Sequence, residues 1–215
     1  MKGGGFLAIW SDVQASEETD YLHWLIREHT AERIGVEGFL ATRVFRALGT
    51  DIRRFFILYE LEAPEVVSGP DYLARLNSPT PWSRRIMPIL DNFVRGGGRH
   101  VISGGTGQGG VIAAVQLHDM PADGAVLVAR LASLDRIAAA RLFETDQAKT
   151  SIKTRESGMR THDGIFTGLL LIEGVDQPAV RAALDQLASA LPAIGATDGM
   201  PLYGLCFGLD RRHLR

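Results

Sequence analysis

The spacing of hydrophobic and polar positions changes several times in the first half of the chain, and each change marks a predicted element. Residues 39–46 and 54–61 mix apolar with polar positions as half-buried strands do, and the short turn between them predicts a hairpin. The predicted order is βαββαβ: a strand at 6–10, a helix at 20–34, strands at 39–46 and 54–61, a helix at 71–76 that resumes at 82–90 after Pro79 and Pro81, and a strand at 92–95.

The same order returns in the second half, which predicts an internal repeat. Residues 137–144 echo residues 39–46, with arginine and phenylalanine in the same register. The predicted elements are strands at 110–118, 137–144, 165–173 and 202–209, and helices at 125–134 and 177–191. We therefore expect an α+β protein made of tandem ferredoxin-like βαββαβ repeats, each of about a hundred residues.

Residues 96–110 are rich in glycine and separate the two halves. A phosphate-binding loop is not favoured, because a strand rather than a helix follows and no Gly-Lys-Ser/Thr sequence is present. The pattern predicts a flexible linker at 96–110 between a first unit at 1–95 and a second unit at 111–215. The first unit carries the candidate site, and we expect the second to be mainly scaffold.

Composition and charge narrow the classes of partner. Hydrophobic residues make up 46% of the chain and charged residues 22%. The chain has 23 basic and 25 acidic residues, which gives a net charge of -2. This balance gives no field that would gather nucleic acid or an anionic membrane, so neither is an expected partner. No apolar run is long enough for a membrane helix or a signal segment, and a cytoplasmic protein is expected. The single Cys206 lies in an apolar run and is predicted to be buried.

The first predicted helix carries the richest set of polar side chains. At about 100° per residue, one face of this helix combines three aliphatic residues with His29 and Arg33. The aliphatic residues are Leu22, Leu25 and Ile26. A histidine can exchange a proton near neutral pH, and an arginine can hold a carboxylate or enolate oxygen. The alternative is structural: His29 hydrogen-bonds a carbonyl and Arg33 extends to the helix edge.

Arg43 and Tyr59 come from the two hairpin strands and could bring polar groups to the same unit. Alternation places Ala41, Arg43 and Phe45 on one face of their strand, but the sequence does not decide which face. A solvated or cross-strand-paired Arg43 is the alternative. Trp82, after the rigid Pro79–Pro81 break, either lines a pocket mouth or packs one unit against the other.

Residues 24–33 and 38–45 together resemble the signature of EthD-like proteins in the dimeric α+β barrel superfamily, and the resemblance extends over about residues 6–95. The matching positions are Trp24, Glu28-His29, Arg33, Gly38-Phe39 and Arg43-Val44-Phe45. The superfamily includes cofactor-free monooxygenases, muconolactone isomerases, polyketide cyclases and haem-degrading enzymes. The resemblance implies a pocket between the sheet and its helices, with a helix histidine as acid or base.

These observations lead to one hypothesis and two rivals. We expect an enzyme without metal or other cofactor that acts on a hydrophobic cyclic or aromatic ligand, as an isomerase, a lyase or cyclase, or an oxygenase. His29 is the predicted acid/base, Arg33 or Arg43 the predicted oxyanion partner, and the predicted substrate contacts are Trp24, Tyr59 and Trp82. The rivals are a non-catalytic binding or carrier protein, and a haem protein with His29 as axial ligand.

Two further expectations concern metals and assembly. His118 and His162 lack the tight spacing of metal ligands, so a metal site is not expected. Tandem units can form a barrel within one chain and still pair through their outer faces, which favours a homodimer.

Overall fold

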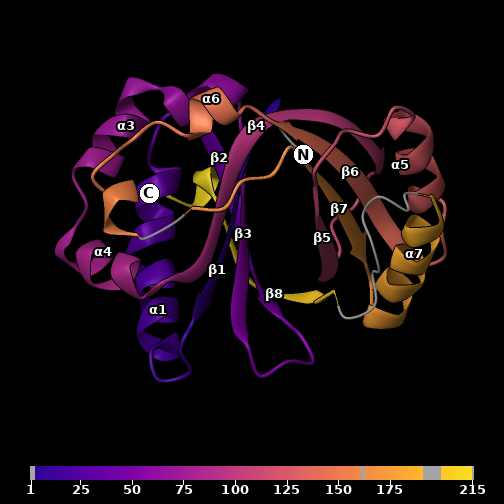
Figure 1. Cartoon of the computed structure of the whole chain (residues 1–215), viewed down its shortest axis with the longest axis horizontal. Coiled ribbons are helices and arrows are strands. Elements are labelled where there is room, and N and C mark those ends of the chain that lie inside the picture. Colours follow the sequence, from indigo (N-terminus) through magenta and orange to yellow (C-terminus); the bar gives the residue numbers. More distant parts are fainter. Residues whose placement is uncertain (1–2, 161–162, 191–199, 215) are drawn as a thin grey trace.

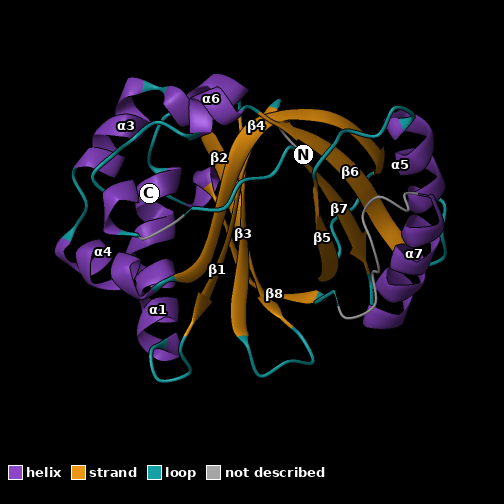
Figure 2. Cartoon of the chain, viewed as in Figure 1, coloured by secondary structure: helices purple, strands orange, loops and turns teal. Residues whose placement is uncertain are grey.

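In the computed structural model, which describes residues 3–160, 163–190 and 200–214, eight strands form a closed barrel with helices on two opposite sides (Figures 1 and 2). The predicted mixed α+β class is therefore confirmed. The strands are β1 (Gly5–Val13), β2 (Phe39–Ala47), β3 (Arg53–Leu61), β4 (Asp91–Gly105), β5 (Val111–Leu117), β6 (Ile137–Thr145), β7 (Gly168–Gly174) and β8 (Tyr203–Asp210).

Most helices are short, and several are single 3-10 or π turns. The α-helices are α1 (Glu18–Trp24), α2 (Thr30–Ile34), α3 (Pro70–Asn77), α4 (Pro81–Ile86), α5 (Gly124–Ala132), α6 (Gln147–Thr150) and α7 (Gln177–Ala190). The turns are η1 (Leu25–His29), η2 (Pro64–Ser68), η3 (Met87–Ile89), η4 (Ser157–Met159) and η6 (Arg211–His213). None of the helices in the described part of the chain has the length and apolar character to cross a membrane.

The strand order explains how two similar halves make one barrel. The order is β1-β3-β2-β8-β5-β7-β6-β4, closed by pairing of β4 with β1. Each half is a four-stranded antiparallel sheet with the spatial order fourth, first, third, second, as the βαββαβ pattern predicts. The halves join where β2 pairs with β8 and β4 pairs with β6, so neither sheet keeps a free edge.

Alternation along each strand divides the apolar residues between the barrel interior and the helical layers. Phe6 and Trp10 of β1 point into the barrel, where their rings contact Phe143 at 4.8 Å and Phe56 at 4.7 Å between centroids. Leu7 and Ile9 point outward into a core under the first unit's helices. A separate core lies under α5 and α7. The barrel interior is thus largely filled by side chains, and the cavity described below lies in the first unit's helical layer.

Residues 96–105 correct the prediction of a flexible linker, because they belong to the long strand β4. β4 pairs with β1 and then with β6, so it carries the chain from one sheet into the other. Its glycines leave room for close neighbours: a Cβ on Gly96 would lie 2.5 Å from the Phe166 ring, and one on Gly98 would clash with the carbonyl oxygen of Glu144. Glycine here marks close packing on a strand rather than flexibility.

The first helical segment is interrupted by the π turn η1, which changes its buried face. Thr30 Oγ1 donates a hydrogen bond of 2.7 Å to the Leu25 carbonyl oxygen within this turn. Ile26 was expected on the same helix face as His29 and Arg33, but it lies in the π turn, which departs from the 100° spacing, and it is 53% exposed. Trp24 and His29 instead face the sheet.

Residues 146–160 and 163–166, between β6 and β7, lie against the helices of the first unit (orange in Figure 1). We name residues 146–160 and 163–166 the crossing segment. Glu156 N donates to the Leu76 carbonyl oxygen at 3.1 Å, and Arg95 N donates to the Gly164 carbonyl oxygen at 3.3 Å. The second unit therefore contributes to the first unit's helical layer, which corrects the expectation that it is mainly scaffold. His162 lies outside the described residues.

Cys206 is also a correction, because its side chain is exposed. It lies on β8, next to Leu205, which is itself 47% exposed. β8 joins the two sheets at the β2 side. Phe207 and Leu209 of this strand pack against the first unit's core, whereas Leu205 and Cys206 are exposed, so the apolar run does not bury every member.

Candidate active site

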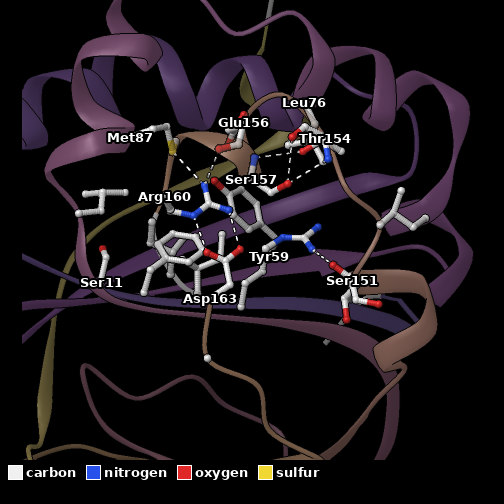
Figure 3. A pocket seen from close by; sticks show the side chains of 18 of the residues that line it. Ser11, Tyr59, Leu76, Met87, Ser151, Thr154, Glu156, Ser157, Arg160 and Asp163 are labelled. Atoms are coloured by element: carbon white, nitrogen blue, oxygen red, sulfur yellow. Dashed lines mark hydrogen bonds and ion pairs between the residues drawn. The ribbon is translucent and has the colours of Figure 1, made fainter.

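A cavity of about 290 Å³ lies between the outer face of β1, β3 and β4, the first unit's helices and the crossing segment (Figure 3). The sheet side is apolar around Ile9, Ile57 and Phe93, and its polar members include Ser11, Tyr59 and Arg95. Gln147, Ser151, Ile152 and Ile165 line the cavity and are exposed to solvent, so they mark its mouth. The volume is at the lower end of the range of roughly 300–1,000 Å³ for small-molecule sites.

His29 lines this cavity from the end of η1 and is only 4% exposed. Its ring packs on Trp24 with a centroid distance of 4.0 Å, and the Trp24 indole nitrogen donates to Ser83 Oγ at 3.2 Å. Burial, followed by the charges of Arg33 and Arg160, lowers the pKa of His29 well below 6.5. The imidazole is therefore neutral at physiological pH and able to accept a proton.

Arg33 also lines the cavity, one helical turn beyond His29 on α2. Its Nη2 donates to Glu156 Oε2 at 2.5 Å, and its Nη1 lies 3.3 Å from a carboxylate oxygen of Glu32. Although burial opposes its charge, Glu156 is the main group that keeps the pKa of Arg33 above its ordinary value. Nη1 has no hydrogen bond within the described part of the chain, and so remains available as a donor.

Tyr59 completes the polar group, from β3 on the sheet side of the cavity. Its ring meets Phe39 edge-on at 5.5 Å, and its hydroxyl has no hydrogen-bond partner among the described residues. Burial raises the pKa of Tyr59, which therefore stays protonated. A buried phenol in this state is a hydrogen-bond donor awaiting an acceptor.

The crossing segment closes the cavity with charged side chains that local sequence patterns did not reveal. Arg160 forms a two-pronged ion pair with Asp163, at 2.7 and 2.8 Å, and its guanidinium lies 3.9 Å from the Phe93 ring centroid. It also donates to Met87 Sδ and to the Glu156 carbonyl oxygen, both at 3.3 Å (Figure 3). These residues lie in a loop with no periodic pattern, so nothing in the sequence links them to His29.

Two of the predicted site residues lie elsewhere. Arg43 points into the barrel interior with Phe45 and pairs with Glu173 at 2.6 Å, on the opposite face of the sheet from His29. Trp82 does not line the cavity; its indole nitrogen donates to Asp20 at 3.1 Å, and Arg85 lies over its ring. Trp82 therefore fastens α4 to α1. Of the six predicted residues, the structure brings together His29, Arg33, Trp24 and Tyr59.

The cavity does not fit haem, the group for which His29 was the candidate axial ligand. The cavity holds only about 290 Å³, the His29 ring packs on Trp24 at an interplanar angle of 32°, and both the Arg33–Glu156 and Arg160–Asp163 ion pairs line the same space. A planar macrocycle would have to displace both pairs. Within the residues that the structure describes, no three His, Cys, Asp or Glu side chains form a potential metal site.

No protein-family model matches the chain, and no curated protein sequence matches it. Among solved structures, the chain is similar to an anthrone oxidase-like protein, with a TM-score of 0.64 and 9% identity over 100% of this chain and 96% of that one. It is also similar to a "putative monooxygenase" from Lactobacillus acidophilus NCFM, with a TM-score of 0.51 and 9% identity over 97% of both chains. A third, a "putative chlorite dismutase", has a TM-score of 0.53 and 13% identity over 97% of this chain and 96% of that one.

The chain has the dimeric α+β barrel fold. At such low sequence identity, the structural similarity establishes the fold alone, since one fold supports many unrelated reactions. The chemistry must therefore be argued from the cavity, where a neutral imidazole, a buried cation and a phenol converge on a small apolar space. Such a set can remove a proton and stabilise the resulting oxyanion.

Proposed function

We propose that the protein is a small-molecule enzyme that removes a proton from a hydrophobic aromatic compound with an enolisable or phenolic oxygen. One observation carries the proposal: His29, Arg33 and Tyr59 line the same cavity, and His29 Nδ1, Arg33 Nη1 and Tyr59 Oη lack hydrogen-bond partners in the described part of the chain. Buried polar atoms are nearly always partnered, so three such atoms around one space favour a ligand that supplies the partners.

The three groups have complementary roles in the proposal. His29 is the general base, because its lowered pKa keeps the ring neutral. Tyr59 and Arg33 donate hydrogen bonds to the substrate oxygen, which gains negative charge as the proton leaves. Trp24 holds the imidazole plane and presents an aromatic wall to the ligand.

Among the reactions open to this site, the names of the structural neighbours support cofactor-free oxygenation, since one is called anthrone oxidase-like and another a "putative monooxygenase". A C–H bond conjugated with the carbonyl breaks, which in anthrone belongs to the methylene group opposite the carbonyl in the central ring. Its proton passes to His29, and the electron pair is delocalised onto the oxygen as an enolate. The enolate carbon gives electrons to O₂ and forms a C–O bond, and the hydroperoxide takes the proton back. Loss of water then leaves a new carbonyl, so one O₂ is consumed and one water released per turnover.

Oxygen uptake with anthrone as the substrate tests this proposal. Replacing His29 by alanine should reduce kcat by about 10²–10⁴-fold, the usual contribution of a general base, while anthrone affinity is retained. His23→Ala is the matched control, since His23 lies on the preceding helix α1 and does not line the cavity. It should leave turnover unchanged. Unaltered turnover in His29→Ala would refute the role of His29.

The same experiment addresses the carrier alternative. A protein that only binds such compounds would show tight anthrone binding without oxygen uptake, and the His29→Ala variant would then differ from wild type in affinity alone.

A further inference from the structure

Arg95 differs from the other two arginines that line the cavity. Arg33 is paired with Glu156, and Arg160 with Asp163. Arg95 instead donates to two neutral oxygens, the Thr150 carbonyl at 2.6 Å and the Tyr72 hydroxyl at 3.3 Å. No carboxylate lies within ion-pair distance of Arg95 in the described part of the chain, so its charge is not balanced by a partner.

The surroundings of Tyr72 strengthen this observation. The Arg95 guanidinium lies 5.8 Å from the Tyr72 ring centroid, and the Arg33 guanidinium lies 5.9 Å from the same centroid. Two cations on one buried ring repel each other, and only Arg33 has carboxylates beside it. An anion placed beside Arg95 would balance the second charge.

The sheet fixes how far Arg95 lies from the proposed reaction centre. Arg95 of β4 is opposite Ile9 of β1, which is in turn opposite Ile57 of β3. Tyr59 is two residues further along β3, on the same face. Because neighbouring strands are 4.7–4.9 Å apart, β3 and β4 are separated by roughly 9–10 Å. An aromatic ring system can bridge such a span, with one polar end at each strand.

We propose that Arg95 binds the carboxylate of an aromatic acid whose other end carries the reacting oxygen beside Tyr59 and Arg33. This inference rests on the proposed function and specifies its substrate class. Arg95 is a substrate-binding residue in this scheme, and Tyr72 holds its guanidinium in place. A guanidinium offers two parallel donors to a carboxylate, a geometry that a neutral amide does not match.

A matched pair of fluorescent probes tests the proposal: 2-naphthoate, which carries the carboxylate, and 2-naphthamide, which does not. Binding of each to the full chain is followed by probe fluorescence. Wild type should bind the acid about tenfold or more tightly than the amide, the effect of a charge-assisted hydrogen bond. Arg95→Gln should abolish the preference for the acid, and Arg95→Lys should retain part of it because the charge remains.

Arg99→Gln is the control, because Arg99 lies on the same strand, is largely exposed and does not line the cavity. It should keep the preference for the acid. The His29→Ala variant should keep it too, since His29 acts in turnover, and this separates the present inference from the proposed function. The inference would be overturned if wild type bound both probes equally, if it bound neither, or if Arg95→Gln kept the preference for the acid. The proposed function is tested separately, by the oxygen uptake of His29→Ala.

Discussion

At the scale of single residues, burial sets the chemistry of the site more than any specific charge partner does. Burial is the largest influence on the pKa values of His29 and Tyr59, and it moves both toward their neutral forms. Arg33 keeps its charge because Glu156 and Glu32 lie beside it. The cavity therefore holds a neutral base and a neutral donor next to a permanent cation.

The lowered pKa of His29 predicts how stability depends on pH. Below 6.5 the unfolded histidine binds a proton that the buried ring does not, so acid favours the unfolded state. His29 therefore has its full stabilising effect above pH 6.5, and this effect is lost as the pH falls, by up to about 1.4 kcal/mol per pH unit, until the folded pKa is reached. The free energy of unfolding in urea can be measured for wild type and His29→Gln across roughly pH 4.5–8. Its decrease toward acid pH should be shallower in the variant.

His23→Gln, from the same helical region but outside the cavity, should keep the wild-type slope. Parallel pH profiles for wild type and His29→Gln would mean that the buried ring titrates like an exposed one.

At the scale of elements, two local features decide which side chains reach the cavity. The π turn η1 brings His29 to the sheet and leaves Ile26 in solvent. β4 places Arg95 and Phe93 on the cavity side, and its glycines let β6 and the crossing segment approach closely. Both features arise from packing against other parts of the chain, which local periodicity does not contain.

The close approach at Gly98 gives a prediction for the strand. Gly98→Ala places a methyl group against the Glu144 carbonyl and the Asp146 amide nitrogen, so the β4–β6 ladder must shift. The expected loss is about 1–3 kcal/mol in the free energy of unfolding, as for overpacked sites. Gly110→Ala is the control, because nothing lies within 4 Å of its added Cβ, and it should change stability by less than about 0.5 kcal/mol. Equal effects in urea titrations would show that β4 adjusts freely.

At the scale of the whole molecule, a buried ionic cluster ties the two sheets together. Arg43 of β2 and Arg141 of β6 both pair with Glu173 of β7, and Gly109 N also donates to Glu173 at 3.1 Å. Arg43 and Arg141 hold equivalent positions in the two halves, with Phe45 and Phe143 two residues further on. Arg43, one of the two arginines predicted as oxyanion partners, is therefore part of the ionic cluster that joins the two sheets.

Glu173→Gln tests the importance of this cluster. It leaves two buried guanidinium groups without their carboxylate, and should destabilise the protein by about 3–5 kcal/mol. Glu144→Gln removes an exposed partner of Arg99 on the neighbouring strand, and should cost no more than about 1 kcal/mol. Because the sheets share the barrel core, both variants should unfold in a single transition by tryptophan fluorescence and far-UV circular dichroism. Separate transitions would mean that the halves fold independently.

The order of strands and helices in each half could be predicted from the sequence alone. Strand alternation and helical spacing are local properties, so βαββαβ could be recognised in each half, and the Arg-x-Phe match located equivalent positions on β2 and β6. His29 and Arg33 were recognisable because ionisable residues on an apolar helix face need partners. The close packing at the β4 glycines and the exposure of Ile26 could not be recognised in this way, since each depends on a neighbour that is distant in sequence.

The side chains that meet in the cavity come from parts of the chain that are distant in sequence. Arg33 and Glu156 are 123 residues apart in the chain, and Arg95 meets the Thr150 carbonyl across 55 residues. No spacing rule connects such positions, because the crossing segment reaches the first unit only after the barrel has closed. The face of β2 that holds Arg43 was likewise open in the sequence, since alternation gives two equivalent choices until a second sheet covers one of them.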